Sequence, residues 1–430
     1  PCGAPGRFIP TFARVTVTRI SKWLRTLGPG LVTGAADDDP AGIATYSVVG
    51  AQFGNAFLWS AFLTWPLMAC AQMTCARIGL VSGAGLGSAI RKKFPRWIGG
   101  VLALALLVAN AINIAADLAG MGEAMSMLHL GPTLAYVAIF GVALAVLGVR
   151  LPYATIANVL KWLALALLAY VISGFLAKPD WSGVAHDVLL PTMPHGKDQW
   201  QALVAILGTT ISPYLFYWQA GQEIEEQKDE GKTSERSRAN ASRKEIRDRR
   251  IDVATGTIAS NVVMFFIILT AAATLHAHGT HHIETTRQAA EALRPVAGDA
   301  AFVLFTVGLV GTGLLAIPTL AGSAAYAFAE TFDWRYGLNE RFRRAVPFYG
   351  VYVAAILGGI VLNLLGISAV RALVWSAIIN GLLAPVVLFV LLAVMVDAKL
   401  MKGQASPRIA VAIIALTALL MTGAGVAMFL

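Results

Sequence analysis

Three consecutive acids, Asp37, Asp38 and Asp39, lie inside an apolar stretch that runs from Leu27 to Phe53 and is long enough to cross a membrane. A carboxylate in a lipid bilayer costs several kcal/mol, so these side chains must face a water-accessible, protein-lined cavity. The next residues, Pro40 and Gly42, remove a backbone donor and a side chain, which predicts that the helix unwinds here. Bare carbonyl oxygens beside a carboxylate make a cation site.

A second apolar stretch is interrupted in a similar way between Gly208 and Gln219. Pro213 breaks the pattern, and Thr209, Thr210 and Ser212 supply oxygens beside it. The two interrupted stretches are the first and the sixth along the chain. This is the spacing expected when spans one to five and six to ten are inverted repeats, with a binding site between them at the membrane midplane.

Further polar residues punctuate other apolar stretches. Asn110, Asn113 and Asp117 are three and four residues apart, which places them on one face of a helix. Asp117 has two interpretations, a functional group or a structural one paired with a neighbouring helix. Gln219 and Asn380 are weaker candidates, because a single intramembrane amide often only joins two helices.

The composition indicates an all-α integral membrane protein rather than a soluble one. Hydrophobic residues make up 57% of the chain and charged residues 13%, and the mean hydropathy is +0.68. We expect about eleven transmembrane spans. The expected spans are Leu27–Phe53, Ala56–Leu80, Trp97–Leu118, Thr133–Val149, Ala154–Leu176, Leu203–Ile224, Val253–Leu275, Phe302–Ala329, Phe348–Leu365, Leu373–Val396 and Ile409–Phe429.

This division predicts one transporter domain over residues 1–430, with a first repeat at 27–176, a second at 203–396 and an extra helix at 409–429. Residues 225–252 form a charged loop. The net charge of +9 comes mostly from segments that follow the even-numbered spans or precede the first, which predicts a cytoplasmic N-terminus and an outside C-terminus. The basic residues concerned are Arg14, Arg19, Lys22, Arg25, Arg91, Lys92, Lys93, Arg96, Arg150, Arg243, Lys244, Arg247, Arg249, Arg250, Arg335, Arg341, Arg343, Arg344, Lys399 and Lys402.

These residues resemble the Nramp-type divalent metal transporters. The first-span motif runs from Gly28 to Gly54 through Asp39-Pro40, and the sixth-span motif runs from Gly208 to Pro213. Ala116-Asp117-Leu118-Ala119 and Thr319-Leu320-Ala321-Gly322 are also similar to the family. The resemblance implies the leucine-transporter-type fold, in which helices 1 and 6 are broken. It also implies a metal site at Asp39 and Ser212, with the carbonyl groups of Ala36 and Thr209.

The chain departs from the family pattern at two ligand positions. Gly42 stands where the family has an asparagine, and Ser212 and Tyr214 stand where it has a methionine and a histidine. The soft thioether ligand is therefore absent, and an oxygen-only, roomier site remains, near which Asp37 and Asp38 add negative charge. Hard cations prefer oxygen ligands, and magnesium keeps several of its waters. This pattern resembles the Nramp-related magnesium transporter branch.

The resulting expectation is a transporter of Mg²⁺, and possibly also of Mn²⁺, that binds a partly hydrated ion and works by alternating access. Proton coupling should be weak or absent, because Gly120 and Tyr214 replace the family's proton-carrying acid and histidine. Accessory roles are open for Asp37, Asp38, Tyr214, Asp117, Asn113, Gln219 and Asn380. We expect a monomer in the cell membrane, in contact with lipid, with no bound cofactor and no nucleic-acid partner.

Three alternatives remain at this point. The first is a proton-coupled Mn²⁺ or Fe²⁺ symporter of the same family. The second is an organic-solute transporter of the same fold, although the aspartate triplet would repel a substrate that carries a carboxylate. The third is an intramembrane enzyme that uses these acids, which fits poorly because the triplet lies at mid-helix and is followed by Pro40.

Overall fold

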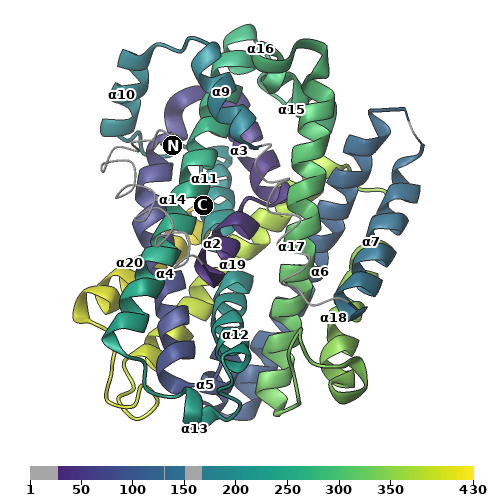
Figure 1. Ribbon diagram of the computed structural model, residues 1–430. Helices are drawn as coiled ribbons and strands as arrows, with labels where there is room; N and C mark the ends of the chain where they lie inside the picture. Colours follow the sequence, from purple (N-terminus) through teal and green to yellow (C-terminus); the bar gives the residue numbers. More distant parts are fainter. Residues whose placement is uncertain (1–27, 130, 151–166) are drawn as a thin grey trace, which may run out of the picture.

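The computed structural model describes residues 28–129, 131–150 and 167–430 (Figure 1), and within these ranges it contains helices and no β-strand. The expected fifth span, Ala154–Leu176, therefore lies partly outside the described residues, as do the basic residues Arg14 to Arg25. The longer helices are α2 (Pro29–Asp37), α3 (Pro40–Phe53), α4 (Trp59–Ser82), α5 (Leu86–Lys93), α6 (Arg96–Ser126), α7 (Thr133–Arg150), α9 (Leu168–Leu176), α10 (Trp181–Leu189), α11 (Lys197–Thr210), α12 (Pro213–Asp229), α14 (Arg243–Thr274), α17 (Ala301–Phe332), α18 (Val346–Asn363), α19 (Ala369–Met395) and α20 (Arg408–Ala427). The shorter ones include α13 (Glu235–Arg238), α15 (Thr286–Ala290) and α16 (Arg294–Ala297).

Seven helices in the described residues are long and apolar enough to cross a membrane, or up to eight if one bent pair of helices counts as a span. The seven are α6, α7, α14, α17, α18, α19 and α20. The bent pair joins residues 40–57 to α4 at an angle of 107°. The first and sixth expected spans are absent from the seven because each is divided into two short helices.

Both interruptions begin a new helix at a proline. The helix α3 starts at Pro40 and α12 starts at Pro213, the two prolines that the sequence marks as helix breakers. A proline is well placed at the first turn of a helix, because the N–H group that it lacks would have no partner there. The predicted broken helices are thus confirmed, as α2 with α3 and α11 with α12.

The half-helices lie inside the bundle, among the long helices (Figure 1). The long helix α14 packs against α2, α3 and α4, while α6 packs against α17, α18 and α19. On the outer faces, large apolar side chains are exposed, for example Phe62 at 60% and Trp97 at 69%. An apolar exterior around a core that holds polar groups is the arrangement expected for helices surrounded by lipid.

Segments that follow the even-numbered spans meet at one end of the bundle, called here the charged end. The helix α5 is tied there by three ion pairs, which join Lys92 to Glu235, Arg91 to Asp333 and Lys93 to Asp397. The hydrogen bond from Lys93 lowers the pKa of Asp397 below its usual value. The basic segments that follow the second, sixth, eighth and tenth spans therefore lie together, as the alternation of spans predicts.

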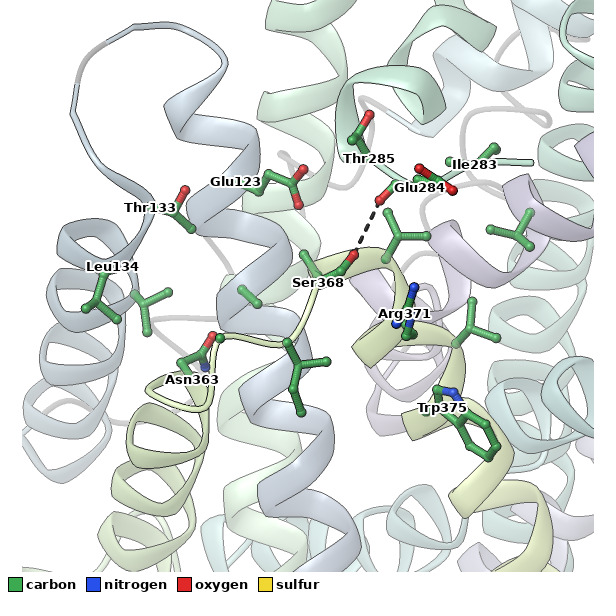
Figure 2. Close-up of a pocket in the computed structure, with 18 of the residues that line it drawn as sticks. Glu123, Thr133, Leu134, Ile283, Glu284, Thr285, Asn363, Ser368, Arg371 and Trp375 are labelled. Atoms are coloured by element: carbon green, nitrogen blue, oxygen red, sulfur yellow. Dashed lines mark hydrogen bonds between the residues drawn. The ribbon is translucent and has the colours of Figure 1, made fainter. Parts of the chain in front are cut away.

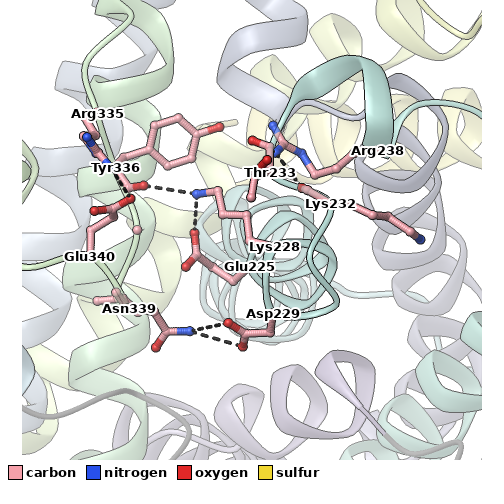
Figure 3. A network of polar contacts seen from close by, with 12 residues as sticks. Glu225, Lys228, Asp229, Lys232, Thr233, Arg238, Arg335, Tyr336, Asn339 and Glu340 are labelled. Atoms are coloured by element: carbon pink, nitrogen blue, oxygen red, sulfur yellow. Dashed lines mark hydrogen bonds and ion pairs between the residues drawn. The ribbon is translucent and has the colours of Figure 1, made fainter.

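A second network at the charged end joins α12 to the segment after α17 (Figure 3). The Lys228 ammonium group donates to the Glu225 carboxylate at 2.9 Å and to the Tyr336 carbonyl at 3.1 Å. Asn339 donates to Asp229 at 3.2 Å. Residues 225–252, expected as a charged loop, comprise the end of α12, the short α13 and the start of α14.

Candidate cation-binding site

Asp39 occupies the break in the first expected span. The helix α2 ends at Asp37, α3 begins at Pro40, and one Asp39 carboxylate oxygen accepts the N–H of Gly42 at 2.7 Å. This is the side-chain bond of a helix N-cap, so the acid that the sequence singles out is also the residue that starts the second half-helix. Asp39 is 2% exposed, which removes it almost completely from bulk solvent.

The other Asp39 oxygen is reached from two further helices. Asn113 on α6 donates to it at 3.2 Å, and the Tyr214 hydroxyl on α12 lies 3.4 Å away. The same hydroxyl lies 3.3 Å from the carbonyl oxygen of Ala36. Asp39, Asn113, Tyr214 and Ala36, which the sequence proposes as site residues, are therefore in one place.

The break in the sixth expected span presents oxygens of its own. The Ser212 hydroxyl lies 2.6 Å from the carbonyl oxygen of Gly208 and 2.9 Å from that of Thr209, at the end of α11, and its single proton is shared between them. Gly42 lies where the two breaks come closest. A Cβ atom added at this position would be 3.0 Å from the Thr209 hydroxyl and 3.4 Å from Asp39. Two of the oxygens expected to bind an ion, the Ala36 and Thr209 carbonyl groups, thus lie within hydrogen-bond distance of a hydroxyl group.

Asp37 and Asp38 turn to a different neighbour, Ser260 on α14. The Ser260 hydroxyl lies 2.7 Å from Asp37 and 3.2 Å from Asp38. A serine hydroxyl has only one proton to donate, so the two carboxylates share a single donor. Sequence reasoning missed Ser260, although its neighbours Thr257 and Asn261 mark the seventh span as polar at this level.

Tyr46, one turn beyond Gly42, is a second residue that the sequence analysis missed. It is fully buried, and its hydroxyl has no hydrogen-bond partner of normal geometry among the described residues. A tyrosine in an apolar helix resembles ordinary packing in the sequence, and only the fold shows that this hydroxyl is enclosed one turn from the first break.

The four buried acids share one electrostatic property. Asp37, Asp38, Asp39 and Asp117 are each at most 5% exposed, and throughout the described ranges none of them forms an ion pair with a basic side chain. Among the described residues, neither oxygen of Asp117 makes a hydrogen bond of normal geometry. Such groups need a positive charge from outside the protein, which is either a cation or protons.

The other expected polar residues are placed differently. Asn110 donates to the Leu320 carbonyl and to the Ser323 hydroxyl at 2.8 Å, and so it joins α6 to α17. Gln219 donates to Glu223 at 2.8 Å, in a network at the charged end. Asn380 is buried on α19, and its side-chain oxygen has no hydrogen-bond partner among the residues described.

Two of the cavities at the end opposite the charged one lie beside α3. The smaller, of about 140 Å³, is lined by α3, α11 and α19, and it reaches Thr45, which is less than one helical turn from Gly42. The larger, of about 920 Å³, shares Val48 and Trp375 with it and is bordered by Glu123 and Arg371 (Figure 2). The cavities at this end therefore extend along α3 toward the candidate site.

At the charged end, the Arg249 guanidinium closes the bundle. It pairs with Glu223 at 2.8 Å, with Glu226, and with Asp252 at 2.7 Å. Asp252 in turn accepts the N–H groups of Gly28 at 2.8 Å and Gly30 at 2.7 Å. This set of contacts, the Arg249 network, fastens α2 and α12 to α14.

The arrangement offers one carboxylate and several neutral oxygens at the point where the two breaks meet. In the part of the chain that the structure describes, no three His, Cys, Asp or Glu side chains converge as metal ligands. A site built on Asp39 alone would therefore rely on carbonyl and hydroxyl oxygens, which are ligands for hard cations.

The fold is found in solved transporter structures. The chain resembles the manganese transporter of Eremococcus coleocola in complex with an aromatic bis-isothiourea compound, with a TM-score of 0.72 and 19% identity over 98% of this chain and 87% of that one. It also resembles Mhp1, a nucleobase-cation-symport-1 family transporter, with a TM-score of 0.53 and 16% identity over 94% and 90% of the two chains. Together with the two broken helices, these likenesses show that the chain has the leucine-transporter-type fold.

The Nramp family, described as natural resistance-associated macrophage protein-like, matches residues 30–430, and the chain belongs to this family. It is 28% identical over 391 residues to the divalent metal cation transporter MntH of Klebsiella pneumoniae, with 90% of this chain and 89% of that protein covered. It is 25% identical over 372 residues to MntH of Yersinia pestis, with 83% and 82% covered. The predicted family is thus confirmed, and the protein is a multi-pass membrane transporter and not an enzyme.

Proposed function

We propose that this protein transports a divalent cation, Mg²⁺ first and Mn²⁺ second, by alternating access through the two broken helices. Asp39 is the anionic ligand, and the Ser212 hydroxyl and the carbonyl groups of Ala36 and Thr209 complete an oxygen shell around a partly hydrated ion. The names of the relatives support the general class of cargo, since MntH is a divalent metal cation transporter and the Eremococcus protein is a manganese transporter.

One observation carries the proposal, which is the uncompensated negative charge at the first break. Among the described residues, Asp39 is held by neutral donors only, namely the Gly42 N–H, Asn113 and Tyr214. A buried carboxylate without a basic partner is costly, whereas a cation bound beside it supplies the missing charge. Asp37, Asp38 and Asp117 raise the local negative potential further.

The choice of magnesium depends on the ligand types. Ser212 places a hydroxyl where a thioether would favour softer transition metals, and Gly42 leaves space where an amide would bind. Magnesium dehydrates reluctantly and usually keeps several waters, so a roomier oxygen site suits it. Manganese shares the preference for oxygen ligands and is the second ion.

Proton coupling in this proposal is weak or absent. Gly120, which follows Asp117 by one turn, carries no titratable group, and Tyr214 stands where the family pattern has a histidine. In the proposed orientation, the charged end faces the cytoplasm, because basic segments stay on that side of a membrane. The protein then acts as a monomer in the cell membrane, with the N-terminus inside and the C-terminus outside.

The test is uptake by the purified full chain in proteoliposomes that contain magnesium-sensitive and pH-sensitive dyes. Asp39→Asn should abolish Mg²⁺ and Mn²⁺ uptake while keeping the elution profile of the folded protein. Asp229→Asn, which neutralises an exposed acid at the charged end, is the matched control and should transport normally. Undiminished uptake by Asp39→Asn would refute the site, and a proton flux that follows the metal flux would refute the absence of coupling.

A further inference from the structure

A cavity of about 560 Å³ at the charged end is lined by four arginines. Arg243, Arg247 and Arg250 come from the first two turns of α14, and Arg77 comes from α4. Ile246 lines the same cavity, and Gln404, from the segment before α20, lines it on another side. The cavity is separate from the candidate cation site, and none of these arginines belongs to the Arg249 network.

The positive charge of this cavity is almost uncompensated. In the described ranges, Arg77, Arg243 and Arg250 form no ion pair, and the stretches outside these ranges, 1–27, 130 and 151–166, contain no Asp or Glu. Arg247 has only its neighbour Asp248, at 3.5 Å. Arg77 donates to the carbonyl group of Gln404 at 3.0 Å, while its Nε atom is buried without a hydrogen-bond partner. Four guanidinium groups therefore line one cavity with almost no negative charge beside them, and such a cavity favours the binding of an anion.

The surface beside the cavity is apolar and faces outward. On α14, Ile251 is 40% exposed and Ile258 and Val262 are also exposed, at helical spacing from Arg247. On α20, Ile409 is 72% exposed directly after Arg408. Along α14 and at the start of α20, which both pack against α4, the exposed residues thus change from basic to apolar beside the cavity. Such a change is expected at the level of the lipid headgroups.

We propose that this arginine cavity binds the phosphate group of an anionic phospholipid whose acyl chains lie along the exposed apolar faces of α14 and α20. A guanidinium group matches two phosphate oxygens with two parallel hydrogen bonds, so arginine suits this ligand better than lysine does. Basic pockets at the ends of membrane helices on the cytoplasmic side recognise such headgroups. A free phosphate ion would satisfy the guanidinium groups, but it would leave the adjoining apolar faces without a role.

The experiment measures lipid retention on the purified full chain by native mass spectrometry, with phosphatidylglycerol and phosphatidylcholine as probes. The test variant is the triple substitution Arg243→Gln, Arg247→Gln and Arg250→Gln. The matched control is Arg341→Gln, Arg343→Gln and Arg344→Gln, three exposed arginines near the charged end that do not line the cavity. Both variants lose the same charge.

The expected result is that phosphatidylglycerol binds the parent chain and the control variant equally, and that its apparent affinity falls by more than about tenfold in the test variant. Phosphatidylcholine should bind weakly to all three. Equal loss in both variants would overturn the proposal, because the effect would then be net charge alone. If inorganic phosphate displaced phosphatidylglycerol at a similar concentration, free phosphate would bind as well as the lipid does, and the assignment of the lipid as the ligand would be wrong. This experiment measures lipid binding and not transport. A negative result would therefore leave the proposed cation site untouched, and loss of the cation site would leave lipid binding unchanged.

Discussion

Gly42 and Thr209 lie face to face across the two helix breaks, and a Cβ atom at position 42 would lie 3.0 Å from the Thr209 hydroxyl oxygen. The glycine therefore leaves a space between the half-helices α3 and α11, next to Asp39. A larger side chain there would enter the position where the proposed ion and its waters lie. This contact makes position 42 the most direct control of the size of the site.

Replacing Gly42 with asparagine should shift selectivity from Mg²⁺ toward Mn²⁺. The amide oxygen adds a ligand while its bulk displaces water, and magnesium loses more than manganese when hydration is restricted. We expect the ratio of Mn²⁺ to Mg²⁺ uptake to rise up to about tenfold, which corresponds to about 1.4 kcal/mol. Gly42→Ala is the control, since it adds bulk without a ligand and should lower both rates together. An unchanged ratio in the asparagine variant would show that position 42 lies outside the ion's shell.

Ser212→Met should act through ligand softness rather than size. A thioether favours manganese and cadmium over magnesium, so the uptake ratio of Cd²⁺ to Mg²⁺ should rise by about tenfold or more. Ser212→Ala separates this effect from the loss of the hydroxyl bonds to Gly208 and Thr209. If the methionine and alanine variants show the same ratio in competition uptake assays, residue 212 does not contact the ion.

Arg249→Met should destabilise the folded protein, because Glu223 and Asp252 are fully buried and would lose their basic partner. Removing one member of a buried ion pair costs about 3–5 kcal/mol. The unfolding temperature in detergent should fall markedly, and residues of α2 near Gly30 should become accessible to a thiol reagent when they are changed to cysteine. Arg236→Met, at an exposed position on α13, should leave both measurements unchanged. A variant as stable as the parent would show that the network does not hold the charged end closed.

Gly208→Ala should weaken the contact between α11 and α19. A Cβ atom at Gly208 would overlap the backbone of Ala377 and Gly381, and backbone atoms cannot move aside as a flexible side chain can. Overpacking of this kind costs about 1–3 kcal/mol, so thermal unfolding should occur at a lower temperature. Gly423→Ala on α20 meets nothing within 4 Å, and it should be neutral or stabilise by up to about 1 kcal/mol. Equal unfolding temperatures for the two variants would contradict the close approach.

The sequence by itself determined where the backbone breaks. Pro40 and Pro213 lack the N–H group that a continuous helix needs, and the aspartates beside Pro40 are too costly to face lipid. These are local constraints that any folded form of the chain must meet, and α3 and α12 begin at these prolines. The family resemblance was likewise visible in short motifs around the breaks.

The tertiary structure alone decided which partner each polar residue has. Asn113 reaches Asp39, whereas Asn110, less than one turn away on the same helix, joins α17, and Gln219 belongs to the charged end instead of the site. Ser260 is beside Asp37 only because α14 packs against α2. Such partners depend on how helices far apart in the chain cross and rotate against one another, and helical periodicity in one sequence carries no information about that geometry.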